Sequence, residues 1–373
     1  MYPKVKPALA RAWRDLQTVQ FGVTPAHAVV LGPVDTATGS LIDRIDGTRG
    51  MDRLRAEAGA LGLPGECADH LVRQLTGAGL IDDAPAGGAA GGGRALPERL
   101  GPDLGSLSLV RREPGGARAG LAARRGTRVQ VRGAGRVGAL VAAVLAGAGV
   151  GRVEVLDGGR VVPGDLAPGG MGPESVGRLR GEAAASLVRS AGPERPPRAG
   201  ELPGPEPGLA LVVVAPREGL DAWAPDPGAA AGWMESGVPH LYAGVLEGTG
   251  LVGPLVLPGG TACAGCLERD RVDRDRAWPR LLVQWRTAHR RRGVPACDLG
   301  LATAVAGLAA AHALAFLDGE LPASTGARWE AALPGLHWTH SRAEPHPGCG
   351  CGAWRPGEGD SSAAVGPQDT MAG

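Results

Sequence analysis

This sequence has few lysines, a small net charge and no long apolar run. Lysine occurs only at Lys4 and Lys6, and arginine supplies the rest of the basic charge. The excess of Arg, Ala, Gly and Pro is typical of a GC-rich genome, so we infer little chemistry from it. Because the formal net charge is +1, no bulk attraction to nucleic acid or to a membrane surface is expected.

The sequence also lacks the usual marks of a secreted or membrane-embedded chain. It has no N-terminal apolar segment of the signal-peptide kind and no run of 18 apolar residues. We therefore expect a soluble, cytoplasmic protein. The most apolar stretch, residues 299–317, is rich in Ala and Gly, and we expect it to form a helix that packs on a sheet.

The first 83 residues are predicted to form a small α+β module. Their pattern predicts two strands and three helices, over residues 19–23, 28–31, 38–45, 51–61 and 66–76. A hairpin with three helices is a winged-helix arrangement. The module lacks a basic recognition helix, so we do not expect it to bind DNA. We expect a peptide to add as a strand at the sheet edge; the alternative is a stabilising appendage without a ligand.

The remaining chain divides by composition. Residues 84–94 are rich in Gly and Ala, which predicts a flexible linker. Residues 95–354 are long enough for a domain with a sizeable core. Residues 355–373 are polar and rich in Gly and Ser, which predicts a disordered tail.

Residues 127–157 carry the main fold signal of the large domain. A β-branched strand is followed by Gly133, Gly135 and Gly138 in a G-x-G-x-x-G turn, then by a helix and a second strand ending at Asp157. This is the βαβ unit of a Rossmann-like α/β sheet with flanking helices. A continuous apolar run over residues 209–215 predicts a central parallel strand of the same sheet.

Each residue type in the turn has a physical role in nucleotide binding. Gly133 allows the tight turn, Gly135 lets the backbone approach a phosphate, and Gly138 allows the helix to pack closely on the strand. The helix N-terminus can hold an anion, and Asp157 can accept a hydrogen bond from a ribose hydroxyl. The alternative is a doubly wound sheet whose turn no longer binds nucleotide.

Four cysteines in two close pairs predict a metal site. Cys263 and Cys266 form a C-x-x-C pair, and Cys349 and Cys351 form a second pair near the C-terminus. Four thiolates suit a closed, structural zinc site. His346 could replace one cysteine of the second pair, and four unmetallated thiols are the alternative.

The order of these pieces resembles the ThiF/MoeB/HesA superfamily of ubiquitin-activating-type adenylyltransferases, over residues 95–353. The resemblance rests on the glycine-turn unit, the GDL of residues 164–166, the VGRLRGEAA helix start, the LVVVA strand, the segment of residues 237–266 and the Ala-rich helix. The superfamily is often dimeric, so a homodimer is a further expectation.

Within that superfamily, the front module looks like the PqqD-like leader-peptide recognition element. Together with the C-x-x-C and the HPGCGC segment of residues 346–351, it is similar to the docking proteins of azole and azoline (TOMM) peptide biosynthesis. The resemblance implies binding of a precursor leader peptide and its presentation to a YcaO-type cyclodehydratase. It implies no nucleic-acid or membrane partner.

The resemblance also indicates a degenerate catalytic site. The family's Asn-Leu-x-Arg-Gln segment is Asp165-Leu166-Ala167-Pro168-Gly169 in this chain, so its arginine is missing. The family's lysine falls at about Arg180, and its magnesium-binding Asp-Ala-x-Asp is Val214-Ala215-Pro216-Arg217. An arginine at a magnesium position repels the ion, so binding of ATP and magnesium is doubtful.

Several residues could rescue activity. Glu218 could hold magnesium, Arg160 or Arg178 could replace the missing arginine, and Arg180 could keep the charge of the lysine. The competing hypothesis is then an active adenylyltransferase that activates the C-terminus of a peptide or of a ubiquitin-like or sulfur-carrier protein. An NAD-dependent oxidoreductase is a third interpretation, which nothing after Asp157 supports.

The remaining cysteines and histidines have ordinary explanations beside functional ones. Cys297 could carry sulfur or an acyl group, as in some activating enzymes, or simply be a small buried residue before the Ala-rich helix. Cys67 is expected in the core of the front module, and His312 is expected to pack within a helix. His240 borders the expected nucleotide crevice and is a further candidate.

Overall fold

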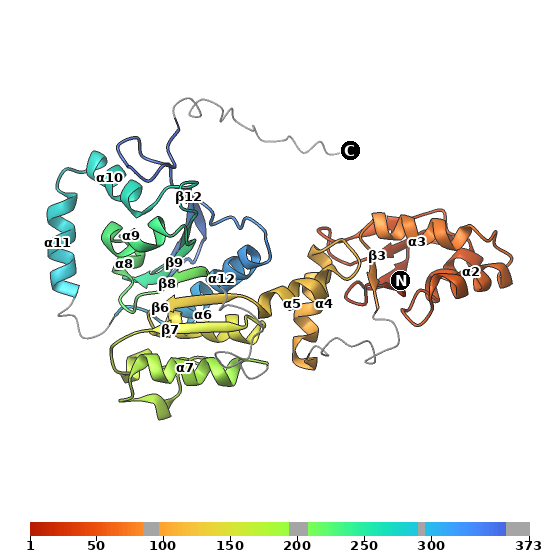
Figure 1. Ribbon diagram of the computed structural model, residues 1–373, viewed down its shortest axis with the longest axis horizontal. Helices are drawn as coiled ribbons and strands as arrows, with labels where there is room; N and C mark the ends of the chain where they lie inside the picture. Colours follow the sequence, from red (N-terminus) through yellow and green to blue (C-terminus); the bar gives the residue numbers. More distant parts are fainter. Residues whose placement is uncertain (85–96, 194–207, 290–294, 356–373) are drawn as a thin grey trace. The chain divides into compact units, whose positions relative to one another are not determined.

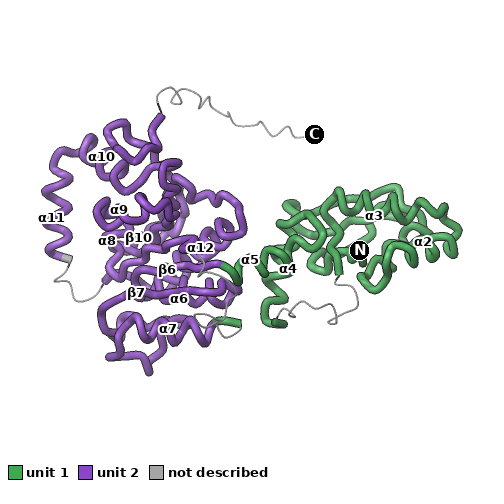
Figure 2. The backbone as a smooth tube through the Cα atoms, in the orientation of Figure 1, with its two compact units in different colours: residues 1–126, 192–196 green, residues 127–191, 197–373 purple. Residues whose placement is uncertain are grey.

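The structure is a computed structural model that describes residues 1–84, 97–193, 208–289 and 295–355. Its contacts divide the chain into two compact units, shown in Figure 2. Unit 1 contains residues 1–126 and 192–196, and unit 2 contains residues 127–191 and 197–373. Residues 85–94 of the predicted linker and 356–373 of the predicted tail lie outside the described residues.

Unit 1 combines short strands with three N-terminal helices. Its elements up to residue 83 are β1 (Pro3–Val5), β2 (Arg11–Trp13), β3 (Val19–Phe21), β4 (Val29–Leu31), α1 (Thr36–Asp43), α2 (Met51–Ala60), α3 (Cys67–Gly77) and β5 (Ile81–Asp83). Strands β2, β3 and β4 form an antiparallel sheet, and β1 pairs with β5. The predicted hairpin and three helices are confirmed, whereas β1, β2 and β5 were not predicted.

Two further helices belong to unit 1, α4 (Gly101–Val110) and α5 (Gly116–Arg125). The buried Lys6 joins their connection to the strands, because its Nζ donates to the Arg111 carbonyl at 2.8 Å. Asp82 Oδ1 accepts the Gly115 N–H at 2.7 Å. Burial lowers the pKa of Lys6. The predicted domain limits, residues 1–83 and 95–354, differ from the limits of these two units and remain a prediction.

Unit 2 is built on a seven-stranded mixed sheet with helices on its faces (Figure 1). The strand order is β12-β11-β10-β9-β8-β6-β7. Strands β7, β6, β8 and β9 are parallel, and β10, β11 and β12 continue antiparallel. The strands are β6 (Arg128–Arg132), β7 (Arg152–Leu156), β8 (Leu209–Val214), β9 (His240–Leu246), β10 (Thr249–Val256), β11 (Ala327–Ala332) and β12 (Thr339–Arg342). The predicted α/β fold with a central β8 is confirmed.

The helices of unit 2 follow the predicted pattern with two differences. They are α6 (Arg136–Gly147), α7 (Arg180–Ala191), α8 (Leu220–Trp223), α9 (Pro227–Glu235), α10 (Ala264–Arg274), α11 (Trp278–His289) and α12 (Leu299–Leu317). The sequence pattern predicts one helix over residues 221–236, whereas the structure has two, because Pro225 and Pro227 interrupt it. The sequence pattern also predicts a helix over residues 174–190, but in the structure this helix begins at Arg180, after a short 3-10 turn.

Helix α12 is long and apolar enough to cross a membrane by length and composition alone. In the structure it packs against α6, β9 and β10. Its fully buried residues recur every three or four positions and therefore lie on one face of the helix; they are Leu301, Ala302, Val305, Ala306, Ala309, Ala310 and Ala313. The prediction that residues 299–317 pack on the sheet is confirmed.

The close approach of α6 to the glycine turn gives a testable prediction. A Cβ added at Gly138 would lie 2.1 Å from the Gly133 carbonyl oxygen. Gly138→Ala should therefore destabilise unit 2 by about 1–3 kcal/mol, measured by urea unfolding. As a control, Gly307→Ala in α12 meets no atom within 4 Å and should stabilise the chain by about 0.5–1 kcal/mol. Equal effects of the two substitutions would contradict the packing described.

Candidate functional site

A cleft opens at the carboxyl ends of β6, β7 and β8, where the strand order reverses. Its volume is about 410 Å³. Gly133, Asp157 and Arg180 line one side, and Trp233 and Tyr242 line the other. Open α/β sheets bind ligands at this kind of crevice, so the cleft is the candidate functional site.

The glycine turn has the backbone geometry of a close turn. Gly133 has a φ of 106°, and a Cβ there would lie 2.0 Å from the Ala215 carbonyl oxygen. Glycine is therefore required at Gly133 by both conformation and space. Gly138 allows α6 to begin against this turn.

The open face of the turn carries the side chain of Arg217. A Cβ added at Gly135 would lie 3.1 Å from Arg217 Cγ and 3.2 Å from Arg217 Cα. Gly135 is the residue that we expected to face a phosphate. In this structure the Arg217 side chain occupies the space over Gly135.

Arg217 is held in this position by two carboxylates. Its Nε donates to Asp165 Oδ1 at 2.5 Å, and its Nη1 donates to Glu218 Oε1 at 2.9 Å. Asp165 follows β7 and is 2% exposed. Asp165 Oδ2 also accepts the Val162 N–H at 3.0 Å and faces Arg180 Nη1 at 3.5 Å. A buried carboxylate with two guanidinium partners and a backbone donor is well compensated.

Both carboxylate oxygens of Asp157 also accept hydrogen bonds. Its Oδ2 accepts the Ala134 N–H at 2.9 Å, and its Oδ1 accepts the Gly159 N–H at 2.9 Å. Arg180 Nε donates to Oδ1 as well, at 2.9 Å. Both oxygens of the predicted ribose acceptor therefore bind groups of the turn and of α7.

The structure brings five residues of the sequence analysis into one ion-pair network: Asp157, Asp165, Arg180, Arg217 and Glu218. The other candidates lie elsewhere among the described residues. The side chain of Arg178 is exposed, and that of Arg160 donates to the Gly177 carbonyl at 2.7 Å. The Cys297 carbonyl accepts from Arg136 Nη1 at 2.6 Å, and burial raises the pKa of the Cys297 thiol. A raised pKa does not suit a nucleophile.

The opposite wall contains groups that sequence reasoning missed. The Arg132 guanidinium lies over the Trp233 ring, 4.9 Å from its centroid. Tyr242 is 2% exposed, and burial raises the pKa of its phenol. Arg132 is the last residue of β6 and directly precedes Gly133. A charged residue at this position is the sequence signal that could have indicated its place in the cleft wall.

His240 lies beneath this wall rather than in the cleft. It is fully buried, and its ring contacts those of Trp233 and Tyr242. Its Nδ1 lies 3.1 Å from the Val238 carbonyl oxygen, and burial lowers the pKa of His240. A neutral histidine that donates to Val238 serves packing. Burial lowers the pKa of His312 in α12 in the same way, and Cys67 is part-buried in α3.

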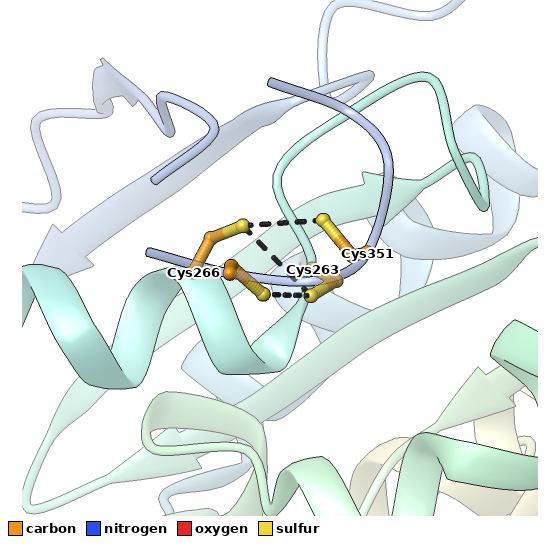
Figure 3. A group of neighbouring side chains, drawn as sticks. Cys263, Cys266 and Cys351 are labelled. Carbon is orange, nitrogen blue, oxygen red and sulfur yellow. Dashed lines mark hydrogen bonds between the residues drawn. The ribbon is translucent and has the colours of Figure 1, made fainter. Parts of the chain in front are cut away.

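The four predicted cysteines form a cluster in unit 2, part of which Figure 3 shows. Their sulfur atoms all lie within 4.8 Å of one another. Cys263 Sγ is 3.6 Å from Cys349 Sγ, and Cys266 Sγ is 3.5 Å from Cys351 Sγ. Sulfurs that bind one zinc ion tetrahedrally are separated by about 3.8 Å, given bonds of about 2.3 Å. The cluster therefore fits a metal ion.

The alternative in which His346 replaces a cysteine does not fit the geometry. His346 Nε2 lies 2.8 Å from Asp273 Oδ2, and His346 Nδ1 accepts the Gly348 N–H at 3.0 Å. Both ring nitrogens are therefore engaged. The structure leaves the four thiols as the ligand set.

Comparisons with known proteins agree with this fold and cleft. The ThiF family model matches residues 116–199, which include the glycine turn, Asp157, Asp165 and Arg180. The chain contains a ThiF family domain. No curated protein matches the sequence.

Solved structures resemble the chain over nearly its whole length. One is E. coli MccB with MccA-N7isoASN, at 14% identity and a TM-score of 0.66, which covers 94% of this chain and 99% of that one. Another is E. coli MccB with ATP, at 15% identity and a TM-score of 0.65, with coverages of 94% and 99%. A third is PaaA, at 16% identity and a TM-score of 0.65, with coverages of 91% and 99%. At such identities the likeness shows the fold.

The ion-pair network of the cleft predicts strong coupling between Asp165 and Arg217. Asp165→Ala leaves two part-buried guanidinium groups without this partner, and it should destabilise the chain by about 3–5 kcal/mol. Asp165→Ala combined with Arg217→Ala should cost about 1–3 kcal/mol less than the sum of the single substitutions. Urea unfolding measures both values.

The exposed pair of Asp270 and Arg274 provides the control for this cycle. Asp270→Ala should change stability by at most about 1 kcal/mol. Strict additivity of the Asp165 and Arg217 substitutions would contradict the network.

Proposed function

We propose that this chain is a cytoplasmic ThiF-type protein of ribosomal peptide modification. It binds a precursor leader peptide and presents it to a YcaO-type cyclodehydratase. Its own adenylylation site is degenerate. The observation that carries this proposal is the Arg217 side chain, which lies over Gly135 where a nucleotide phosphate would approach.

The charges of the cleft support the absence of phosphoryl chemistry. Adenylyl transfer requires cations that are available to the developing phosphoryl charge. Arg180 and Arg217 are instead paired with Asp157, Asp165 and Glu218. A nucleotide would have to break these pairs and leave part-buried carboxylates without partners, which is costly.

Unit 1 supports peptide binding through an open strand edge. Gly22 N donates to the Ala10 carbonyl and Arg14 N donates to the Thr18 carbonyl, which fixes the hydrogen-bonded pairs between β2 and β3. By antiparallel alternation, the backbone groups of Arg11 and Trp13 face away from β3. A peptide strand can pair with such an edge. MccB, which has the same fold, has been solved in complex with MccA as its peptide ligand.

The alternative is an active adenylyltransferase, and three retained features favour it. The glycine turn, Asp157 and a cleft of about 410 Å³ are all retained. MccB has been solved with ATP, and with AMPCPP and MccA. Under this alternative, Arg217 would move aside when a nucleotide enters.

Pyrophosphate exchange with the full chain distinguishes the two functions. We expect no ATP-dependent exchange from the wild type, together with micromolar binding of a leader peptide encoded by a short neighbouring reading frame. Exchange by the wild type that Asp157→Ala abolishes would instead establish the enzyme.

We also propose that the four-cysteine cluster holds a structural zinc ion. Four cysteine sulfurs with tetrahedral spacing suit zinc, and the absence of an open ligand position suits a structural role. The cluster joins the start of α10 to residues 349–351, which are far apart in the sequence. Zinc would supply a cross-link between these segments, and no catalytic step depends on it.

Removal of this zinc should lower the melting temperature by several degrees. A bound ion stabilises the folded chain, and about 1 kcal/mol corresponds to roughly 2–4 °C for a domain of this size. Calorimetry with and without a chelator measures the shift. The control variant Cys67→Ala, which lies outside the cluster, should show the same shift in melting temperature as the wild type. An unchanged melting temperature with four titratable thiols would remove zinc from this account.

A further inference from the structure

The HPGCGC segment of residues 346–351 lies along one face of α10. We name this segment the C-terminal hook. Cys351 contacts Cys266 in the first turn of α10, and His346 contacts Asp273 near its end. Cys266 and Asp273 are seven residues apart, or about two helical turns and 10 Å. The hook is therefore fastened to the same helix face at two separate points.

The second point does not use a cysteine. His346 Nδ1 accepts the Gly348 N–H at 3.0 Å, so this nitrogen carries no proton. The neutral ring then has its proton on Nε2, which donates to Asp273 Oδ2 at 2.8 Å. One imidazole thus shapes the turn of the hook with one nitrogen and binds α10 with the other.

The backbone around His346 is also directed at the cluster. Its carbonyl accepts the Cys349 N–H at 2.9 Å. A Cβ at Gly348 would lie 3.2 Å from His346 Nδ1, so a glycine there lets the ring lie close to the turn. The orientation of Cys349 is therefore linked to that of the imidazole through two residues of backbone.

We propose that His346 and Asp273 form a latch that positions the hook for metal binding. This inference rests on the metal site proposed above. Cys349 and Cys351 are separated from Cys266 by more than 80 residues, so the hook has to be ordered before its thiols can complete a tetrahedral site. The latch orders it through groups that are not ligands. His346 is a positioning residue, and its loss acts on how long the metal is retained.

The test measures zinc in the full chain before it compares variants. The wild type should contain one zinc per chain, and its release to a chromogenic chelator is followed by absorbance. Zinc-free wild-type protein that also fails to take up added zinc would overturn the metal site, and the latch with it. This outcome is distinct from every result on the variants.

His346→Ala and Asp273→Ala should each speed zinc release by about 10-fold to 100-fold, as loss of groups behind metal ligands commonly does. The double variant should release zinc no faster than the faster single variant, because the two groups act as one pair. His346→Asn should be intermediate, since its side-chain oxygen can still accept the Gly348 N–H. Controls are His337→Ala in an exposed loop and Asp270→Ala on the same helix, and both should release zinc at the wild-type rate.

A purely structural role would give a different result. If His346 serves only general stability, then His346→Ala lowers the melting temperature of the metal-free chain as much as that of the loaded chain. The latch predicts an unchanged metal-free melting temperature beside faster release. A release rate within twofold of the wild type, or an equal loss of stability in both forms, would overturn the proposal.

Discussion

Two arginines and two carboxylates meet at the carboxyl ends of β6, β7 and β8, and they balance one another's charge. Arg217 and Arg180 share Asp165, while Arg180 also binds Asp157. Asp157 in turn accepts the backbone N–H of Ala134 in the glycine turn. The network therefore joins β6, β7, α7 and the end of β8 in one place. Part-buried charges of this kind hold each other in position, because separating any one of them leaves another without a partner.

The far wall of the cleft is connected to the cysteine cluster through a shared core. Tyr242 lines the cleft and packs in the same apolar cluster as Cys263 and Cys266. The four-cysteine cluster and the shape of this wall are therefore linked by direct packing. One wall of the cleft is thus fixed by ion pairs, and the other is supported by the core that contains Cys263 and Cys266.

Much of this arrangement could be predicted from the sequence, because its signals are local. The β-branched strands, the glycine turn and the Ala-rich helix each have a pattern within 20 residues, and the structure contains them at the predicted places. The exposed edge strand β12, with the sequence THSR, lacks an apolar pattern and was not predicted. The division between α8 and α9 follows from prolines that the apolar pattern obscured.

The site was less predictable, since its partners are distant in the sequence. The sequence placed an arginine at the magnesium position, but Asp165 lies 52 residues away, and their ion pair follows from the fold. Arg132 and Trp233 form one wall from separate elements and gave no joint signal. For His346 the sequence allowed two roles, and the engagement of both ring nitrogens decides between them.

A crystal structure of the full chain grown with excess ATP and magnesium tests the central claim most directly. The account predicts a cleft without ordered nucleotide, in which Arg217 still covers Gly135 and pairs with Asp165. A magnesium ion and nucleotide held by Asp157 and Glu218, with an arginine at the α-phosphate, would contradict it.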